Sequence, residues 1–208
     1  MARVSPSDVL RGAPPATPDY GDGGRRGGPA RRAGITGIVV ACAAIVMLFA
    51  ALTSAMIVRR GLGGDWQTLT LPGILWVNTG VLLASSFAVE RARRALRQGR
   101  REAFNHLWLA GTVLGFLFLA GQYAAWRQLV AAGVYLATNP SSSFFYLFTV
   151  AHALHLAGGL LALVFITIWA WRLRLGPGRR TAVDVSAFYW HFMDGLWIYL
   201  LLLFRFWG

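Results

Sequence analysis

The chain has 208 residues, of which 56% are hydrophobic and only 13% are charged, and its formal net charge is +12. Ordinary soluble domains carry about 25% charged residues, and a soluble fold of this length could not bury so much apolar surface in one core. Composition therefore excludes an ordinary soluble protein and favours one whose solvent is lipid. The single cysteine, Cys42, excludes an intrachain disulfide and a cysteine-based metal site.

Residues 1–32 differ in composition from the rest, because they are rich in Gly, Pro, Ala and Arg and contain no apolar run. Because burial of this small apolar surface cannot offset the conformational entropy lost on ordering, we expect a disordered cytoplasmic tail. Two interpretations of its arginines stay open. The tail contacts anionic lipid headgroups, or it is a solvated leader that mainly helps to set the topology.

Five apolar runs follow the tail, and each meets or nearly meets the ~20 residues that a helix needs to cross the hydrocarbon. The sequence therefore predicts an all-α fold, a bundle of five transmembrane helices occupying residues 33–208. No internal repeat at a fixed period is evident. The predicted spans are residues 33–58, 71–89, 106–126, 144–171 and 188–207.

The arginines predict the orientation of the bundle. Sixteen of them lie in the tail and in segments 90–105 and 172–187, whereas the two alternate loops hold only three. Because cytoplasmic segments carry the excess of basic residues, we expect the N-terminus inside and the C-terminus outside. Topology and headgroup contact then account for the positive charge, and no nucleic-acid partner is expected.

Ionisable side chains occur within the predicted spans, where they are costly to keep. His152, His155 and Asp194 lie at depth, and Glu90, His106 and His191 lie near the inner ends of their spans. Such groups are functional by default, yet a histidine that bonds to a neighbouring helix also holds a bundle together. The sequence leaves both interpretations open.

The histidines do not fit a haem or copper site. His152 and His155 are one helical turn apart, so they cannot bind the two faces of one haem, and no facing partner lies at their depth. His106 and His191 lie at the inner ends of their spans. We therefore expect no metal and no haem in this chain.

Other polar and small residues are typical of helix packing in lipid. Asn78, Ser85 and Ser86 interrupt the second span, and Gly158 and Gly159 the fourth. Small residues let helix backbones approach closely, and polar ones hydrogen-bond across the interface.

Four stretches carry a family resemblance. They are Asn78-Thr79 followed by Leu82-Leu83-Ala84-Ser85-Ser86, then Gly121-Gln122-Tyr123-Ala124-Ala125-Trp126, then Phe145-Tyr146-Leu147 leading to His152-Ala153-Leu154-His155 and Gly158-Gly159, and finally Tyr189-Trp190-His191-Phe192 with Asp194, Trp197 and Trp207-Gly208. Together they resemble subunit III of the haem–copper (cytochrome c) oxidases, in the short bacterial five-helix form, over residues 34–208.

The resemblance implies a non-catalytic subunit of a proton-pumping terminal oxidase of aerobic respiration, in the bacterial inner membrane. Such a subunit packs on the catalytic subunit I, beside subunit II, binds phospholipid in a cleft and sustains proton uptake. Haem and copper, which pass electrons from cytochrome c to oxygen, belong to the partner subunits. The residues expected at subunit, lipid and helix contacts are Asn78, Ser85, Ser86, His152, His155, Gly158, Gly159, Trp190, His191, Asp194 and Trp197.

One position departs from the family pattern. Many relatives carry a buried glutamate in the first of these helices, just before a run similar to Val46-Met47-Leu48-Phe49, and this chain has Ile45 there. No role of that carboxylate in proton handling or lipid contact is transferred to this chain.

Two other functions remain as alternatives. The chain could serve a quinol oxidase or a nitric oxide reductase as an accessory subunit, since subunit III does not reveal the electron donor of its complex. An independent small transporter is the second alternative, against which stand the lack of repeats, of broken helices and of a cluster of midplane charges.

Overall fold

The structure is a computed structural model, and it describes residues 29–66, 72–135, 139–172 and 179–207. These residues form five α-helices and no strand, as the sequence predicts for an all-α chain. The predicted tail lies almost wholly outside the described residues. The helices are α1 (Pro29–Leu62), α2 (Ile74–Arg97), α3 (Arg101–Ala131), α4 (Pro140–Trp171) and α5 (Arg179–Trp207).

Four of the described helices, α1, α3, α4 and α5, are long and apolar enough to cross a membrane. The fifth, α2, is more polar, because Asn78, Ser85 and Ser86 interrupt its apolar run and Glu90 is followed by four arginines within the helix. A crossing by α2 and the orientation of the bundle therefore stay predictions.

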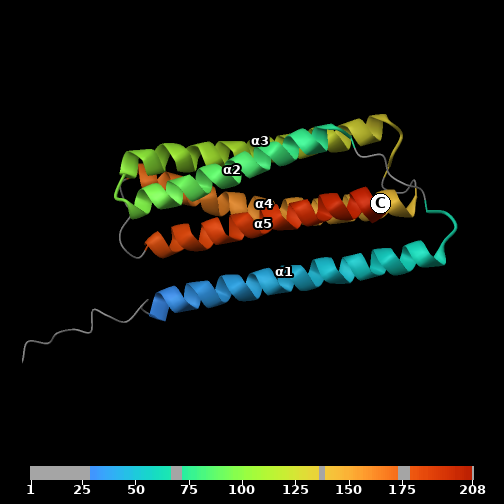
Figure 1. Cartoon of the computed structure of the whole chain (residues 1–208), viewed down its shortest axis with the longest axis horizontal. Coiled ribbons are helices and arrows are strands. Elements are labelled where there is room, and N and C mark those ends of the chain that lie inside the picture. Colours follow the sequence, from blue (N-terminus) through green and yellow to red (C-terminus); the bar gives the residue numbers. More distant parts are fainter. Residues whose placement is uncertain (1–28, 67–71, 136–138, 173–178, 208) are drawn as a thin grey trace, which may run out of the picture.

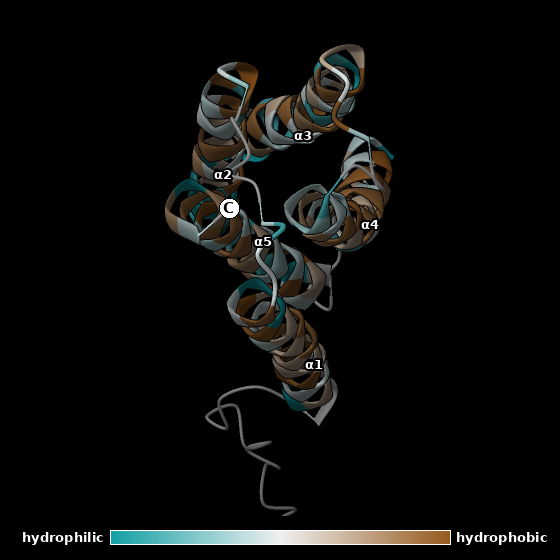
Figure 2. Cartoon of the chain, turned by 90° about the vertical axis from the view of Figure 1, so that its right-hand side faces the viewer, coloured by the Kyte–Doolittle hydropathy of each residue, from teal (hydrophilic) through white to brown (hydrophobic). Residues whose placement is uncertain are grey.

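The five helices run roughly parallel to one long axis (Figure 1). Seen from the end of the bundle, α2, α3, α4 and α5 surround a common core, and α1 lies outside them beside α5 (Figure 2). Among the described residues, α1 contacts only α4 and α5, whereas α2 packs most extensively against α3. The arrangement is thus a four-helix core with one peripheral helix.

Charged side chains concentrate at one end of the core. The first turns of α1 and α5 and the last turns of α2 lie together at this end (Figure 1), and α2 contributes Arg93, Arg94 and Arg97 there. We call it the arginine-rich end. At the opposite end, Arg59 donates two hydrogen bonds to Asp65 just beyond α1, which hold the pKa of that carboxyl below its usual range.

Short connections set the order of the helices. Residues 98–100 join α2 to α3, and Gly99 adopts a left-handed φ of +75° there, which favours glycine. The start of α4 is capped by Asn139, whose side chain accepts a hydrogen bond from the Ser142 amide, and Pro140 occupies the first turn. These signals stop one helix and start the next.

Close contact between α2 and α3 depends on glycine. A Cβ atom at Gly111 would lie 2.7 Å from Cγ2 of Val89 and 3.3 Å from the carbonyl oxygen of Ser85. A Cβ at Gly121 would overlap the side chain of Asn78. Bare glycine backbone lets the two helices approach to this distance, as small residues do in lipid-embedded bundles.

We expect Gly111→Ala to destabilise the bundle by about 1–3 kcal/mol, because the added methyl group has no room against Val89 and the backbone of α2. Unfolding of the purified protein in mixed detergent micelles would measure the change. Gly80→Ala is the matched control, since a Cβ there meets nothing within 4 Å. Equal stability of the two variants would contradict the packing argument.

Candidate functional site: polar contacts between α2 and α5

Two buried tryptophans of α5 anchor that helix to α2. The indole N–H of Trp190 donates to Oγ of Ser85 at 3.2 Å, and that of Trp197 donates to Oγ1 of Thr79 at 3.0 Å. Ser85 in turn donates to the carbonyl oxygen of Gly111 on α3 at 2.7 Å. Thr79 likewise donates to the carbonyl oxygen of Leu75. Each of the two hydroxyls therefore accepts a hydrogen bond from a tryptophan of α5 and donates one to a backbone carbonyl, so both hydroxyls are satisfied.

The amide of Asn78 makes the same kind of link between α2 and α3. Its Nδ2 atom donates to the carbonyl oxygen of Phe118 at 3.0 Å, and the side chain is only 4% exposed. Gly121 lies directly against this amide. Asn78 and Gly121 thus form one packing unit that fixes the distance between α2 and α3.

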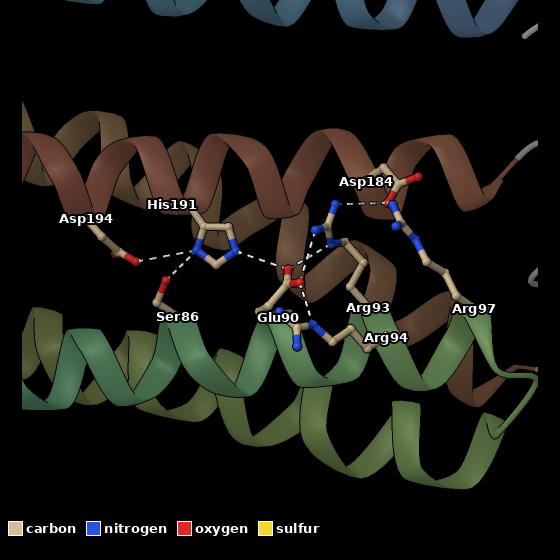
Figure 3. Close-up of polar contacts among 8 residues, drawn as sticks. All are labelled: Ser86, Glu90, Arg93, Arg94, Arg97, Asp184, His191 and Asp194. Carbon is tan, nitrogen blue, oxygen red and sulfur yellow. Dashed lines mark hydrogen bonds and ion pairs between the residues drawn. The ribbon is translucent and has the colours of Figure 1, made fainter.

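His191 lies at the centre of the second group of contacts (Figure 3). Its Nδ1 atom meets the hydroxyl of Ser86 in a short hydrogen bond, and its Nε2 atom lies 3.7 Å from Oε2 of Glu90. The carboxylate of Asp194 is more distant, with Oδ2 at 4.0 Å from Nδ1. The sequence places His191 and Asp194 on one face of α5, but the nearest partners of His191 are on α2.

Ion pairs extend this group to the arginine-rich end. Glu90 accepts hydrogen bonds from Arg93 and Arg94, and Oδ1 of Asp184 lies 3.5 Å from Arg93 and 3.0 Å from Arg97. We call this series the inner polar row; in order from the arginine-rich end toward mid-bundle it comprises Arg97, Asp184, Arg93, Glu90, His191, Ser86 and Asp194 (Figure 3).

His152 lies apart from this row, in the aromatic core. Its ring is 5.3 Å from that of Trp197, tilted by 33°, and Phe118 meets it edge-on at 6.4 Å. Its two ring nitrogens, like the side-chain amide of Gln122, make no hydrogen bond with any described residue. His152 is therefore a buried packing residue of α4, and its two ring nitrogens have no hydrogen-bond partner among the described residues.

On α4, Gly159 faces α5, and the ring of His155 packs against Phe49 of α1. The Nδ1–H group of His155 donates to the carbonyl oxygen of Ala151 one turn earlier in α4, and the hydroxyl of Tyr189 donates to the carbonyl oxygen of His155 at 3.0 Å. A Cβ at Gly159 would lie 2.8 Å from the Tyr189 ring, whereas one at Gly158 would meet nothing within 4 Å. Gly159 is thus the member of the pair that admits α5.

The described residues contain no group of three or more His, Cys, Asp or Glu side chains placed to hold a metal ion. His106 is exposed at the arginine-rich end, edge-on to Trp171. His152 and His155 are directed to different neighbours, Trp197 and Ala151. The hydrogen bonds of the site can hold the helices together, and a series of charged and titratable side chains lies along the interface between α2 and α5.

The structure brings together several of the predicted residues. Ser85 meets Trp190, Ser86 meets His191, and Trp197 meets His152, although their roles at subunit or lipid contacts stay predictions. Sequence reasoning did not assign Glu90, Thr79 and Asp184 to the site. A usable signal existed for Glu90, since it and His191 both lie near the inner ends of their predicted spans.

The fold and these contacts define a polytopic membrane protein in which buried serine, asparagine and tryptophan contacts join apolar helices. The family model described as "Cytochrome c oxidase subunit III" matches residues 31–208.

Curated relatives agree with this match. A probable cytochrome c oxidase subunit 3 of Mycobacterium tuberculosis (strain H37Rv) is 32% identical over 169 residues, covering 79% of this chain and 83% of the relative. A probable subunit 3 of Nocardia farcinica is 32% identical, covering 78% and 82%. A cytochrome c oxidase subunit 3 of Synechocystis is 32% identical, covering 80% and 72%. The chain belongs to the cytochrome c oxidase subunit III family, as its sequence motifs predict.

Ser85→Ala removes the acceptor of a fully buried indole N–H and the donor to Gly111 at once. Interhelical polar contacts in membranes are worth ~0.6 kcal/mol on average and up to ~1.7 kcal/mol, so we expect a loss of about 1 kcal/mol in detergent unfolding. Ser54→Ala, at an exposed position of α1, is the control and should change nothing. An unchanged Ser85→Ala variant would show that Trp190 does not depend on this hydroxyl.

Proposed function

We propose that this chain is the non-catalytic subunit III of a proton-pumping haem–copper terminal oxidase that passes electrons from cytochrome c to oxygen. In this role it packs on subunit I, beside subunit II, binds phospholipid and sustains proton uptake in the bacterial inner membrane. The observation that carries the proposal is the family match over residues 31–208, which covers all five described helices except the first two residues of α1. The haem and copper belong to the partner subunits.

The exposed apolar surface supports a partner or lipid on more than one face. On α1, Val40 is 62% exposed and Met47 is 73% exposed, and α1 contacts only α4 and α5 among the described helices. On α4, Leu154 is 70% exposed. Apolar side chains exposed to this degree require either lipid or a neighbouring subunit.

The inner polar row supports the role in proton uptake. It places the carboxylates of Asp184 and Glu90 near the arginine-rich end and His191 between them and Asp194. Carboxylates and histidine are the side chains that exchange protons in membrane proteins. Because relatives are named cytochrome c oxidase subunit 3, cytochrome c is the electron donor we propose for the complex.

Co-purification tests the assignment. Mild solubilisation of the native membrane followed by capture of this chain should recover a stoichiometric complex with haem absorbance, because the exposed apolar faces need partners. Recovery of a free, haem-free species of 22.8 kDa would contradict the proposal. Solute uptake by the isolated chain in vesicles would support the transporter alternative instead.

The proposed topology has its own test. A reporter that is active only outside the membrane should be active when fused after Gly208 and inactive when inserted within Arg91–Arg101 or Arg172–Arg180, because arginines concentrate on the inner side. Activity at both arginine-rich insertions, with none at Gly208, would indicate either an inverted bundle or a helix α2 that does not cross the membrane. If the reporter were inactive at Gly208 and at both insertions, α5 would be the helix that does not cross.

A further inference from the structure

A groove of about 240 Å³ opens between α1, α2 and α5 at the arginine-rich end, where the inner polar row reaches the surface of the bundle. Its walls are aliphatic and aromatic, with Ile38 and Val39 from α1 and Phe188 from α5. Its polar lining consists of Arg93 and Arg97 of α2 and Thr181 and Asp184 of α5, so its charged groups are two arginines and one carboxylate. Two arginines against one carboxylate give the lining a net positive charge.

The polar and apolar parts of the groove are separated by depth. Along α5, Phe188 lies one helical turn nearer mid-bundle than Asp184. Along α2, Arg97 lies nearer the end of the bundle than Arg93. The same end of α1 supplies the aliphatic wall. The groove therefore has charge at the end of the bundle and hydrocarbon-like walls below it, which is the polarity profile of a phospholipid at a membrane interface.

The guanidinium groups have donors left for a ligand. Both reach the same Oδ1 atom of Asp184, so they lie side by side, and Arg97 spends only its Nη2 atom there (Figure 3). Each guanidinium has five N–H donors. Arg93 also donates from Nε and Nη2 to Glu90, which fixes its position without closing the groove.

We infer that this groove binds the headgroup phosphate of an anionic phospholipid, with Arg97 as the main contact, Arg93 beside it, and an acyl chain along Val39 and Phe188. Arginine recognises phosphate by charge-assisted hydrogen bonds. A zwitterionic headgroup adds a cation that the net positive lining would repel. This inference rests on the phospholipid contact proposed above and assigns it a place and a headgroup class.

The test uses the whole oxidase complex in phosphatidylcholine vesicles containing a phosphatidylglycerol with a photoreactive acyl chain. After illumination, labelled peptides of this chain are mapped. We expect labelling around residues 38–39 or 185–188. Arg97→Gln should lower it about fivefold, the size expected for loss of one basic contact to an anionic lipid. Arg101→Gln removes an equal charge from an exposed position outside the groove lining and should leave labelling unchanged.

A second variant tests whether an acyl chain occupies the apolar part of the groove. Val39→Trp fills the apolar part of the groove while keeping both arginines, so it should also abolish labelling. Equal labelling by a photoreactive phosphatidylcholine, insensitive to Arg97→Gln, would show an ordinary lipid-facing surface and overturn the inference. Absence of labelling in the native complex would also overturn it, since another subunit would then fill the groove.

Recovery of the haem-containing complex is checked for every variant. A variant that loses labelling but retains the complex supports the groove assignment. If the native complex assembles but its groove is not labelled by the phosphatidylglycerol, only the groove assignment is contradicted. Failure of the native chain to join any haem-containing complex would instead defeat the proposed function.

Discussion

The structure depends on one constraint, namely that hydrocarbon offers no hydrogen-bond partner, so a polar side chain inside the bundle can be satisfied only by a partner within the protein. The helix α2 makes this constraint visible. Its Asn78, Thr79 and Ser85 bond to α3, to their own helix or to the tryptophans of α5, and these bonds set which faces of the three helices meet. The most polar of the five helices is consequently the one held between α3 and α5, whereas α1, which is apolar nearly all round, lies at the periphery.

The sequence predicted the helical class, the run of apolar segments and the family because these follow from composition, length and motif. It could not predict which polar residues meet, because that depends on the rotation of each helix about its axis. The spacing of His191 and Asp194 predicted a pair on one face, and that is correct geometrically, but the rotation of α5 brings His191 closer to Ser86 and Glu90. Likewise, Gly158 and Gly159 are equivalent in sequence, and only the structure shows that Gly159 admits Tyr189 while Gly158 faces open space.

Ile45 draws attention to where the carboxylates of this chain lie. The family resemblance implies a buried glutamate on the first helix, and the side chain expected at that place in this chain, Ile45, is apolar and 7% exposed. Glu90 does not replace it, because it lies on α2 at the arginine-rich end and is tied to Arg93 and Arg94. Among the described carboxylates, Asp65, Glu90 and Asp184 are paired with arginines. Asp194 differs, because neither of its carboxylate oxygens makes a hydrogen bond with a described residue.

Asp184 connects the internal packing of the bundle with its lipid-facing surface. Through Oδ1 it holds Arg93 and Arg97, both of which belong to the inner polar row and line the groove. The two arginines thereby have different roles despite their shared partner. Arg93 is fixed by Glu90 and joins α2 to α5, whereas Arg97 is 61% exposed and keeps donors available. The proposed phosphate contact at Arg97 therefore leaves the Glu90–Arg93 ion pair in place, so headgroup binding and helix packing at this end do not compete for the same donors.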